Sequence, residues 1–278
     1  MIFFFLFFIA KVLVVERNLE RGEHLEIIDL IDPTLENDVI FVDKMPQFHN
    51  CCILQNQLLI CRGYDKNRRD KSYYSKDCSV VLPKYKKLFE MLKPRDAASI
   101  VEISQDSLWI TGGYVLNPGF NPFNPMTATN YSIIVEKSTE IISLNRPPIE
   151  GKSLPFAICN HSMVAVDEHS IYLIGGNLDG DISRDCWIID PTNNFDLKPG
   201  PSLQVGRIGH SSSKIKINRK IYLVVAGGYG QNNGRSGSLD SVELLDTTSP
   251  HQGWISGNYK PICFCNSELT KKNVNPYT

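Results

Sequence analysis

The stretch that decides the fold runs from Asn160 to Asp190 and reads NHSMVAVDEHSIYLIGGNLDGDISRDCWIID. Apolar and polar residues alternate up to Val166, a polar turn follows, and the apolar run Ile171–Ile174 returns, which predicts an antiparallel hairpin. A continuous apolar run of strand length predicts burial on both faces, as in sheets that stack on other sheets. Gly175–Gly176 ends the run, and adjacent glycines are expected where φ is positive or another backbone comes close.

The same order of features recurs along the chain. The second residue of each glycine pair, or of its replacement, falls at positions 17, 63, 113, 176 and 228, so the intervals are 46, 50, 63 and 52 residues. A period of about 50 residues with four strands per unit is typical of propeller blades. The pairs expected to have this structural role are Gly112–Gly113, Gly175–Gly176 and Gly227–Gly228.

Two further signatures accompany the glycine pairs. An apolar residue followed by Asp ends a strand at Ile31–Asp32, Ile189–Asp190 and Leu245–Asp246. An Arg or a His stands just before the next unit's first strand, namely Arg95, His161, Arg207 and His210. Together these signatures resemble the kelch family, although Ile and Leu replace the family's usual Tyr and only Trp254 matches its later Trp. The resemblance implies an all-β, kelch-type β-propeller of about five four-stranded blades.

We expect one propeller domain over 11–278, with units near 11–47, 48–93, 94–157, 158–205 and 206–260 and a closing strand at 261–267. The first unit lacks an opening strand in this interpretation, because Lys11–Val15 is its second strand. Ile262–Asn266 would then complete the first blade and close a five-blade ring, which removes exposed sheet edges. The alternative is a fragment of a six- or seven-blade propeller.

Residues 1–10, MIFFFLFFIA, stand apart by composition. Eight apolar residues followed by Ala10 resemble the core and small-residue end of a signal peptide, although no Lys or Arg precedes them. The alternatives are a truncated or artefactual start and a buried strand. A strand is disfavoured because no residue between Phe8 and Lys11 is a turn former. The run is too short to span a bilayer.

Cysteines and sequons bear on the compartment. No CxxC or zinc-finger spacing occurs among the eight cysteines, which argues against a structural metal. Cys51 or Cys52, Cys61 and Cys78 fall on neighbouring strands of one unit, so a cross-strand disulfide is feasible, and buried thiols are the alternative. Asn130 and Asn160 begin N-glycosylation sequons. We expect a secreted glycoprotein, with a cytoplasmic protein as the alternative.

The long connections indicate where a binding surface would lie. Turns after each first strand are short, whereas residues 64–76, 114–130, 177–183 and 229–240 follow the second strands, and 143–155 is assigned to a strand-four connection. All of them would emerge on one face, where a repeat scaffold usually binds its partner. The candidate binding residues on this face are Phe120, Phe123, Tyr229, Arg95, His161, Arg207 and His210. The simpler interpretation of the Arg and His residues is that they hydrogen-bond neighbouring blades.

Charge and motifs restrict the function. A net charge of −1 predicts no field that would draw nucleic acid or an anionic membrane. The six histidines show no clustered pattern, and no hydrolase, zinc-protease or paired-carboxylate motif occurs. We therefore expect a monomeric, non-catalytic module without a cofactor that binds a protein or a glycan. The alternative is a galactose-oxidase-like copper enzyme or a carbohydrate-active propeller.

Overall fold

The computed structural model describes residues 5–8, 11–18, 22–29, 38–41, 50–55, 57–61, 76–80, 86–116, 133–217, 219–232 and 235–257. Within these ranges the chain folds into β-strands and one 3-10 turn, η1 (Pro250–Gln252). The prediction of an all-β fold is therefore confirmed. A search of the same residues finds no helix that is long and apolar enough to cross a membrane.

Five antiparallel sheets of four strands are present in the described part of the chain, and each uses successive segments of sequence. Every main sheet has its first strand at one edge and its last at the other. The sheets are β1 (Phe5–Phe8), β2 (Lys11–Asn18), β3 (Gly22–Asp29) and β4 (Asp38–Phe41); β5 (Asn50–Leu54), β6 (Gln57–Cys61), β7 (Asp77–Val80) and β8 (Lys86–Glu90); β9 (Ser99–Ser104), β10 (Ser107–Thr111), β13 (Thr139–Ser143) and β14 (Arg146–Gly151); β16 (Ser162–Asp167), β17 (Ser170–Ile174), β20 (Cys186–Asp190) and β21 (Asp196–Pro199); and β23 (Ser211–Ile217), β24 (Lys220–Ala226), β27 (Val242–Asp246) and β28 (Ile255–Gly257).

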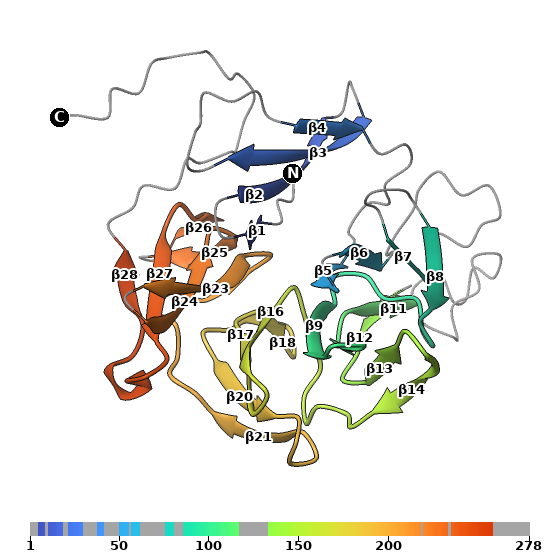
Figure 1. Ribbon diagram of the computed structural model, residues 1–278. Helices are drawn as coiled ribbons and strands as arrows, with labels where there is room; N and C mark the ends of the chain where they lie inside the picture. The colour runs from blue at the N-terminus through green and yellow to red at the C-terminus, as the bar shows by residue number, and fades with distance from the viewer. Residues whose placement is uncertain are drawn as a thin grey trace, which may run out of the picture.

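The sheets lie side by side around a common centre, with the first strand of each toward the middle (Figure 1). Contacts between first strands follow the order β5, β9, β16, β23 and β1. The opening stretch of sequence forms β16, β17 and β20, and Ile171 of β17 pairs with Ala165 on one side and Ile189 on the other. The predicted antiparallel hairpin is thus confirmed, and the apolar run is buried because its sheet packs between two others.

Three of the second-to-third connections carry small hairpins, which the sequence led us to treat as loops. They are formed by β11 (Tyr114–Leu116) with β12 (Ile133–Val135), β18 (Asn177–Leu178) with β19 (Asp181–Ile182), and β25 (Tyr229–Asn232) with β26 (Arg235–Ser238). Two of them extend into three-stranded sheets by pairing with β15 (Ile158–Cys159) and β22 (Arg207–Ile208). The described ends of these connections therefore pair as strands, and strand propensity in such short segments was too weak a signal to reveal them.

Two predictions about strands are wrong. Phe5–Phe8 forms β1 and pairs with β2 from Phe5↔Val14 to Phe8↔Lys11, so the first sheet has an opening strand. Only two residues separate β1 from β2, and two residues are the commonest length of a hairpin connection. Whether the segment also directs secretion stays a prediction. The predicted closing strand, 261–267, lies outside the described residues, and β1 occupies the edge of β2 that it was expected to pair with.

The fourth strand of the third sheet is the second correction. Arg146–Gly151 forms β14 and pairs with β13, although the sequence led us to assign 143–155 to a connection. Pro147 and Pro148 are tolerated because β14 is an edge strand, where missing N–H donors do not break the sheet.

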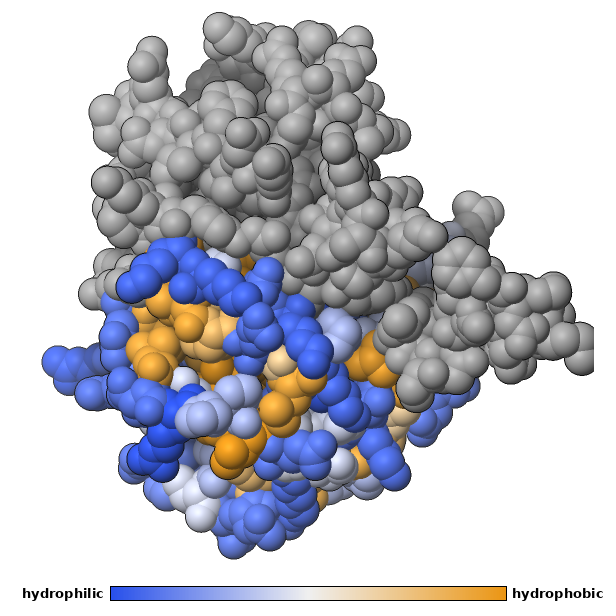
Figure 2. All heavy atoms as spheres, turned by 90° about the vertical axis from the view of Figure 1, so that its right-hand side faces the viewer, coloured by the Kyte–Doolittle hydropathy of each residue, from blue (hydrophilic) through white to orange (hydrophobic). Residues whose placement is uncertain are grey.

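Three clusters of buried apolar side chains fill the described part of the molecule. One lies on β5–β10 and β13, one on β9, β10 and the sheet of β16–β21, and one on that sheet and the sheet of β23–β28. Each cluster therefore spans neighbouring sheets, which makes the sheet-to-sheet contact the main source of hydrophobic stabilisation. On the side of the molecule that carries β8 and β14, apolar residues form patches bounded by hydrophilic ones (Figure 2).

Candidate functional site

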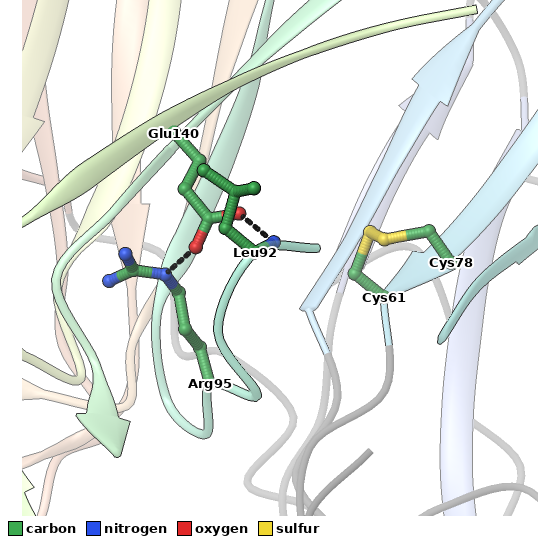
Figure 3. The surroundings of a disulfide bond; sticks show 5 residues. All are labelled: Cys61, Cys78, Leu92, Arg95 and Glu140. Atoms are coloured by element: carbon green, nitrogen blue, oxygen red, sulfur yellow. Dashed lines mark hydrogen bonds and ion pairs between the residues drawn. A yellow bond between two sulfur atoms is a disulfide. The ribbon is translucent and has the colours of Figure 1, made fainter. Parts of the chain in front are cut away.

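Arg95 and Arg207 were predicted to contribute to a binding face, but both side chains are fully buried. The Arg95 Nε atom donates to Glu140 Oε1 at 2.9 Å (Figure 3), and Nη1 donates to the carbonyl oxygens of Gly112 and Ser138 at 2.7 and 3.0 Å. Because its donors are used inside its own sheet, this guanidinium holds the start of β9, the glycine pair and β13 together.

The fifth sheet repeats this arrangement. Arg207 Nη2 donates to Glu243 Oε1 at 2.6 Å, and Nη1 donates to the carbonyl oxygens of Gly227 and Ser241 at 2.9 and 3.2 Å. Glu243 also accepts the backbone N–H groups of Gln204 and Val205, just as Glu140 accepts those of Leu92 and Lys93. We call each arrangement an Arg–Glu brace. The sequence analysis did not single out the Glu of the brace. A lone Glu within the apolar segments TEII and VELL could have indicated a buried carboxylate that needs a basic partner.

The fourth sheet lacks this brace. The position of Arg95 and Arg207 is taken by Ile158, and the position of the Glu by Trp187, which pairs with Leu173 as Glu243 pairs with Val225. Pro155 stands where Leu92 and Gln204 supply an N–H to the Glu. All three members of the brace are therefore replaced together, and Ile158 and Trp187 pack in an apolar cluster instead.

His161 and His210 lie three residues further along the chain than the position of the arginines, so the Arg and His residues grouped as one signature in the sequence occupy two different positions. Both rings are buried. His161 Nε2 is hydrogen-bonded to Thr111 Oγ1 of the preceding sheet at 2.7 Å, and His210 Nε2 to Ser162 Oγ at 2.8 Å. Burial lowers the pKa of both to about 3, so the rings are neutral. The histidines therefore link neighbouring sheets, which confirms the simpler interpretation for them.

The glycine pairs complete this junction. All six glycines have positive φ, as predicted. A Cβ on Gly175 would lie 2.8 Å from the Arg207 carbonyl oxygen and 2.9 Å from His210 Cε1 of the next sheet. The second glycine of each of two pairs donates its N–H across the junction, from Gly113 to Ile158 at 2.8 Å and from Gly176 to Arg207 at 2.9 Å. A side chain would therefore push the sheets apart.

Three left-handed residues connect the sheets near their first strands. Ala97, Asn160 and Gly209 have φ of 51°, 54° and 60° and stand at equivalent positions. The N–H of Asn160 donates to the carbonyl oxygen of Ala97, and that of Gly209 to Asn160. The entries into β9, β16 and β23 thus lie at one end of the molecule, beside the three hairpins. We call this end the hairpin face.

Of the aromatic residues predicted for a binding face, Tyr229 is in the described structure. It begins β25 on the hairpin face and is 46% exposed. Its equivalent in the third sheet, Tyr114, is only partly exposed because it lies against Cys159 and Asn160 of the next sheet. Phe120 and Phe123 lie outside the described residues. Tyr229 therefore remains a candidate contact.

Cysteine pairing follows one of the two alternatives in the second sheet. Cys61 of β6 and Cys78 of β7 are register partners and form a disulfide (Figure 3). Cys159 and Cys186 are buried thiols, and burial raises the pKa of each. Buried neutral thiols of this kind behave as small apolar side chains.

Only one of the two sequon asparagines lies among the described residues. Asn130 lies outside the described residues. Asn160 is half-buried, and its amide nitrogen lies 3.6 Å from Cys159 Sγ. Glycosylation at Asn160 would require this side chain to leave the junction between the third and fourth sheets.

Among the described residues, no group of three or more His, Cys, Asp or Glu side chains is placed to hold a metal ion. The buried histidines and glutamates are used in the inter-sheet bonds and braces described above.

No protein-family model matches the chain. A mouse (Mus musculus) protein named "Multiple epidermal growth factor-like domains protein 8" is 25% identical over 162 residues, which is 57% of this chain. The chain spans only 5% of the length of that protein. This similarity establishes neither a family nor a function.

Proposed function

We propose that the chain is a kelch-type β-propeller that acts as a non-catalytic binding module through its hairpin face. Five four-stranded sheets in sequence order, with contacts between successive first strands, support the propeller. The repeated glycine pairs, braces and inter-sheet histidine bonds support a repeated unit.

The observation that carries the binding role is the contrast between buried and exposed side chains of the repeats. The recurring arginines and histidines are buried and bind groups within the protein, whereas Tyr229, in a hairpin that follows a glycine pair, is exposed. Connections positioned by a rigid scaffold commonly hold binding residues. A protein partner fits an exposed Tyr, since Tyr is enriched at interfaces.

An extracellular setting is part of this proposal. The Cys61–Cys78 disulfide is typical of an oxidising compartment. The similar mouse protein is named for epidermal growth factor-like domains, a disulfide-dense class of secreted module.

The test compares two exposed residues. The protein secreted from mammalian cells would be used to capture partners by cell-surface proximity labelling, with Tyr229→Ser and Ile255→Ser as matched variants. Ile255 is 58% exposed on the edge strand β28, away from the hairpin face. We expect partners that are lost with Tyr229→Ser and retained with Ile255→Ser. Equal retention by both variants would contradict the proposal, and stoichiometric copper in the purified protein would favour an enzyme.

A further inference from the structure

Asp96 lies on the hairpin face at the junction between the third and fourth sheets. Its backbone exchanges two hydrogen bonds with Tyr114, at 2.9 Å and 2.6 Å, so the start of the long connection is fixed beside it. The next sheet contributes Cys159 and Asn160, whose side chains are hydrogen-bonded to the Tyr114 phenol. A carboxyl, a phenol, a thiol and an amide are therefore held together by two sheets.

The carboxyl of Asp96 is incompletely satisfied. Its Oδ1 atom is buried and has no hydrogen-bond partner among the described residues. Burial raises the pKa of Asp96 to about 7, and the hydrogen bond from the Ala97 N–H opposes this increase. The fully buried carboxylates Glu140 and Glu243 each have an arginine. In the described part of the chain Asp96 forms no salt bridge, and an unpaired buried carboxylate is costly.

The fold does not require an acid at this position. The equivalent residues of the next two sheets are Cys159 and Ile208, and their backbones pair in the same way with Asn177 and Tyr229. Asp96 is thus the acid at a position that a thiol or an aliphatic side chain fills elsewhere. This makes one junction of the hairpin face chemically different from the others.

We propose that Asp96, Tyr114 and Asn160 form a site for an organic cation, the ammonium or guanidinium of a Lys or Arg side chain on a protein partner. The proposal rests on the proposed function and specifies its partner. A cation supplies the missing donors to Asp96, and an anion would be repelled by the ionised carboxyl. The Tyr114 phenol is neutral, because burial raises its pKa, and a neutral ring favours a cation at its face.

A metal ion fits the site less well. In the described structure only Asp96 and Cys159 of this cluster are common metal ligands, and they belong to no group of three. The cluster therefore fits an ion that needs one carboxylate and neutral hydrogen-bonding partners.

The experiment uses agmatine and butylamine as probes. Binding to the 15N-labelled protein would be followed by NMR, with Asp96→Asn as the test variant and Asp181→Asn, an exposed acid on the neighbouring β19, as the control. We expect shifts at Ala97, Tyr114 and Asn160, and affinity that is higher at pH 8 than at pH 6. Asp96→Asn should weaken binding about tenfold or more, as the loss of a hydrogen bond to a charged group does. Asp181→Asn should not.

Two results would overturn the inference: equal binding by Asp96→Asn, or shifts that avoid these three amides. Failure of the proposed function is distinguishable. If the probes bind at Asp96 but no partner depends on Tyr229, the cation site stands and the partner-binding role fails. If a Tyr229-dependent partner binds Asp96→Asn normally and the probes do not bind, the cation site fails alone. Thermal unfolding of Asp96→Asn checks that the variant is folded.

Discussion

The fifth and fourth sheets hold the segment before their first strand by different interactions. In the fifth sheet the segment before β23 is held by Arg207, Glu243 and the N–H of Gln204. In the fourth sheet the same places hold Ile158, Trp187 and Pro155, which pack as apolar groups. Pro155 has no N–H, so one of the two N–H groups that the Glu accepts in the braces is absent here. The difference shows that the brace is a unit whose members are replaced together.

Electrostatics explains why partial replacement is disfavoured. Removing one partner of a buried ion pair leaves an uncompensated charge, whereas replacing both partners by packed apolar groups can be nearly neutral. A buried N–H without an acceptor adds its own desolvation cost. Loss of one member therefore destabilises the protein more than exchange of all three.

The largest expected effect is that of Glu243→Ala. This change leaves the buried Arg207 charge and the N–H groups of Gln204 and Val205 without their acceptor. We expect the free energy of unfolding to fall by about 3–5 kcal/mol, measured by urea denaturation. Glu150→Ala on the exposed edge strand β14 is the control and should change stability little. A loss for Glu243→Ala as small as that for Glu150→Ala would show that the brace is not a stabilising unit.

The second sheet contains a disulfide between two of its strands, and removing this disulfide measures how much it stabilises the protein. Cys61 and Cys78 are 17 residues apart. We expect the double variant Cys61→Ala/Cys78→Ala to lose about 3 kcal/mol, the value for a loop of this size. Denaturation with and without a reductant supplies the control, because only the wild-type protein should lose stability on reduction. Insensitivity of the wild-type protein to the reductant would contradict the prediction.

The buried histidines between sheets predict a dependence on pH. Their pKa of about 3 in the folded protein lies below the unfolded value of 6.5, so the unfolded chain binds more protons as pH falls. The stability they contribute is complete above pH 6.5 and is lost toward pH 3. Between pH 6.5 and 5.5 the two histidines together should cost about 2 kcal/mol.

Variants separate this effect from other titrations. His161→Gln and His210→Gln should each flatten the pH dependence of the free energy of unfolding. An unchanged slope in both buried-site variants would exclude the histidines as its source.

The smallest effect is expected for exchange of the whole unit. Arg207→Ile/Glu243→Trp transfers the apolar pair of the fourth sheet to the fifth and should lose about 1–2 kcal/mol, because two N–H groups remain without an acceptor. Adding Gln204→Pro removes one of them and should recover part of this loss. Chemical denaturation of Glu243→Ala, the double variant and the triple variant ranks their free energies of unfolding. A triple variant less stable than Glu243→Ala would show that the two sheets are not interchangeable at this place.

The order of strands was predictable from local pattern. The apolar runs ending in glycine pairs located β10, β17 and β24, because strand length and a continuous apolar run reflect burial directly. The pairs themselves required positive φ, which few residues other than Gly adopt. The β1 strand was missed because the same apolar composition fits a signal peptide, and composition does not record the pairing partner.

The roles of the candidate site residues were not predictable in the same way. Arg95 and Glu140 are 45 residues apart, and Thr111 and His161 are 50 residues apart. A basic residue at a recurring position is compatible with both a ligand contact and an internal brace. Only its burial and its partner distinguish the two.

The sequence by itself determined that the chain is all-β, where most of its strands lie and which backbone positions need glycine, since these depend on neighbours along the chain. The tertiary structure decided that the arginines and histidines bind the protein to itself, that Asp96 lies unpaired beside Tyr114 and Asn160, and that Tyr229 stays exposed. Those outcomes depend on groups brought together from different sheets, and their energies arise from burial, which no stretch of sequence contains alone.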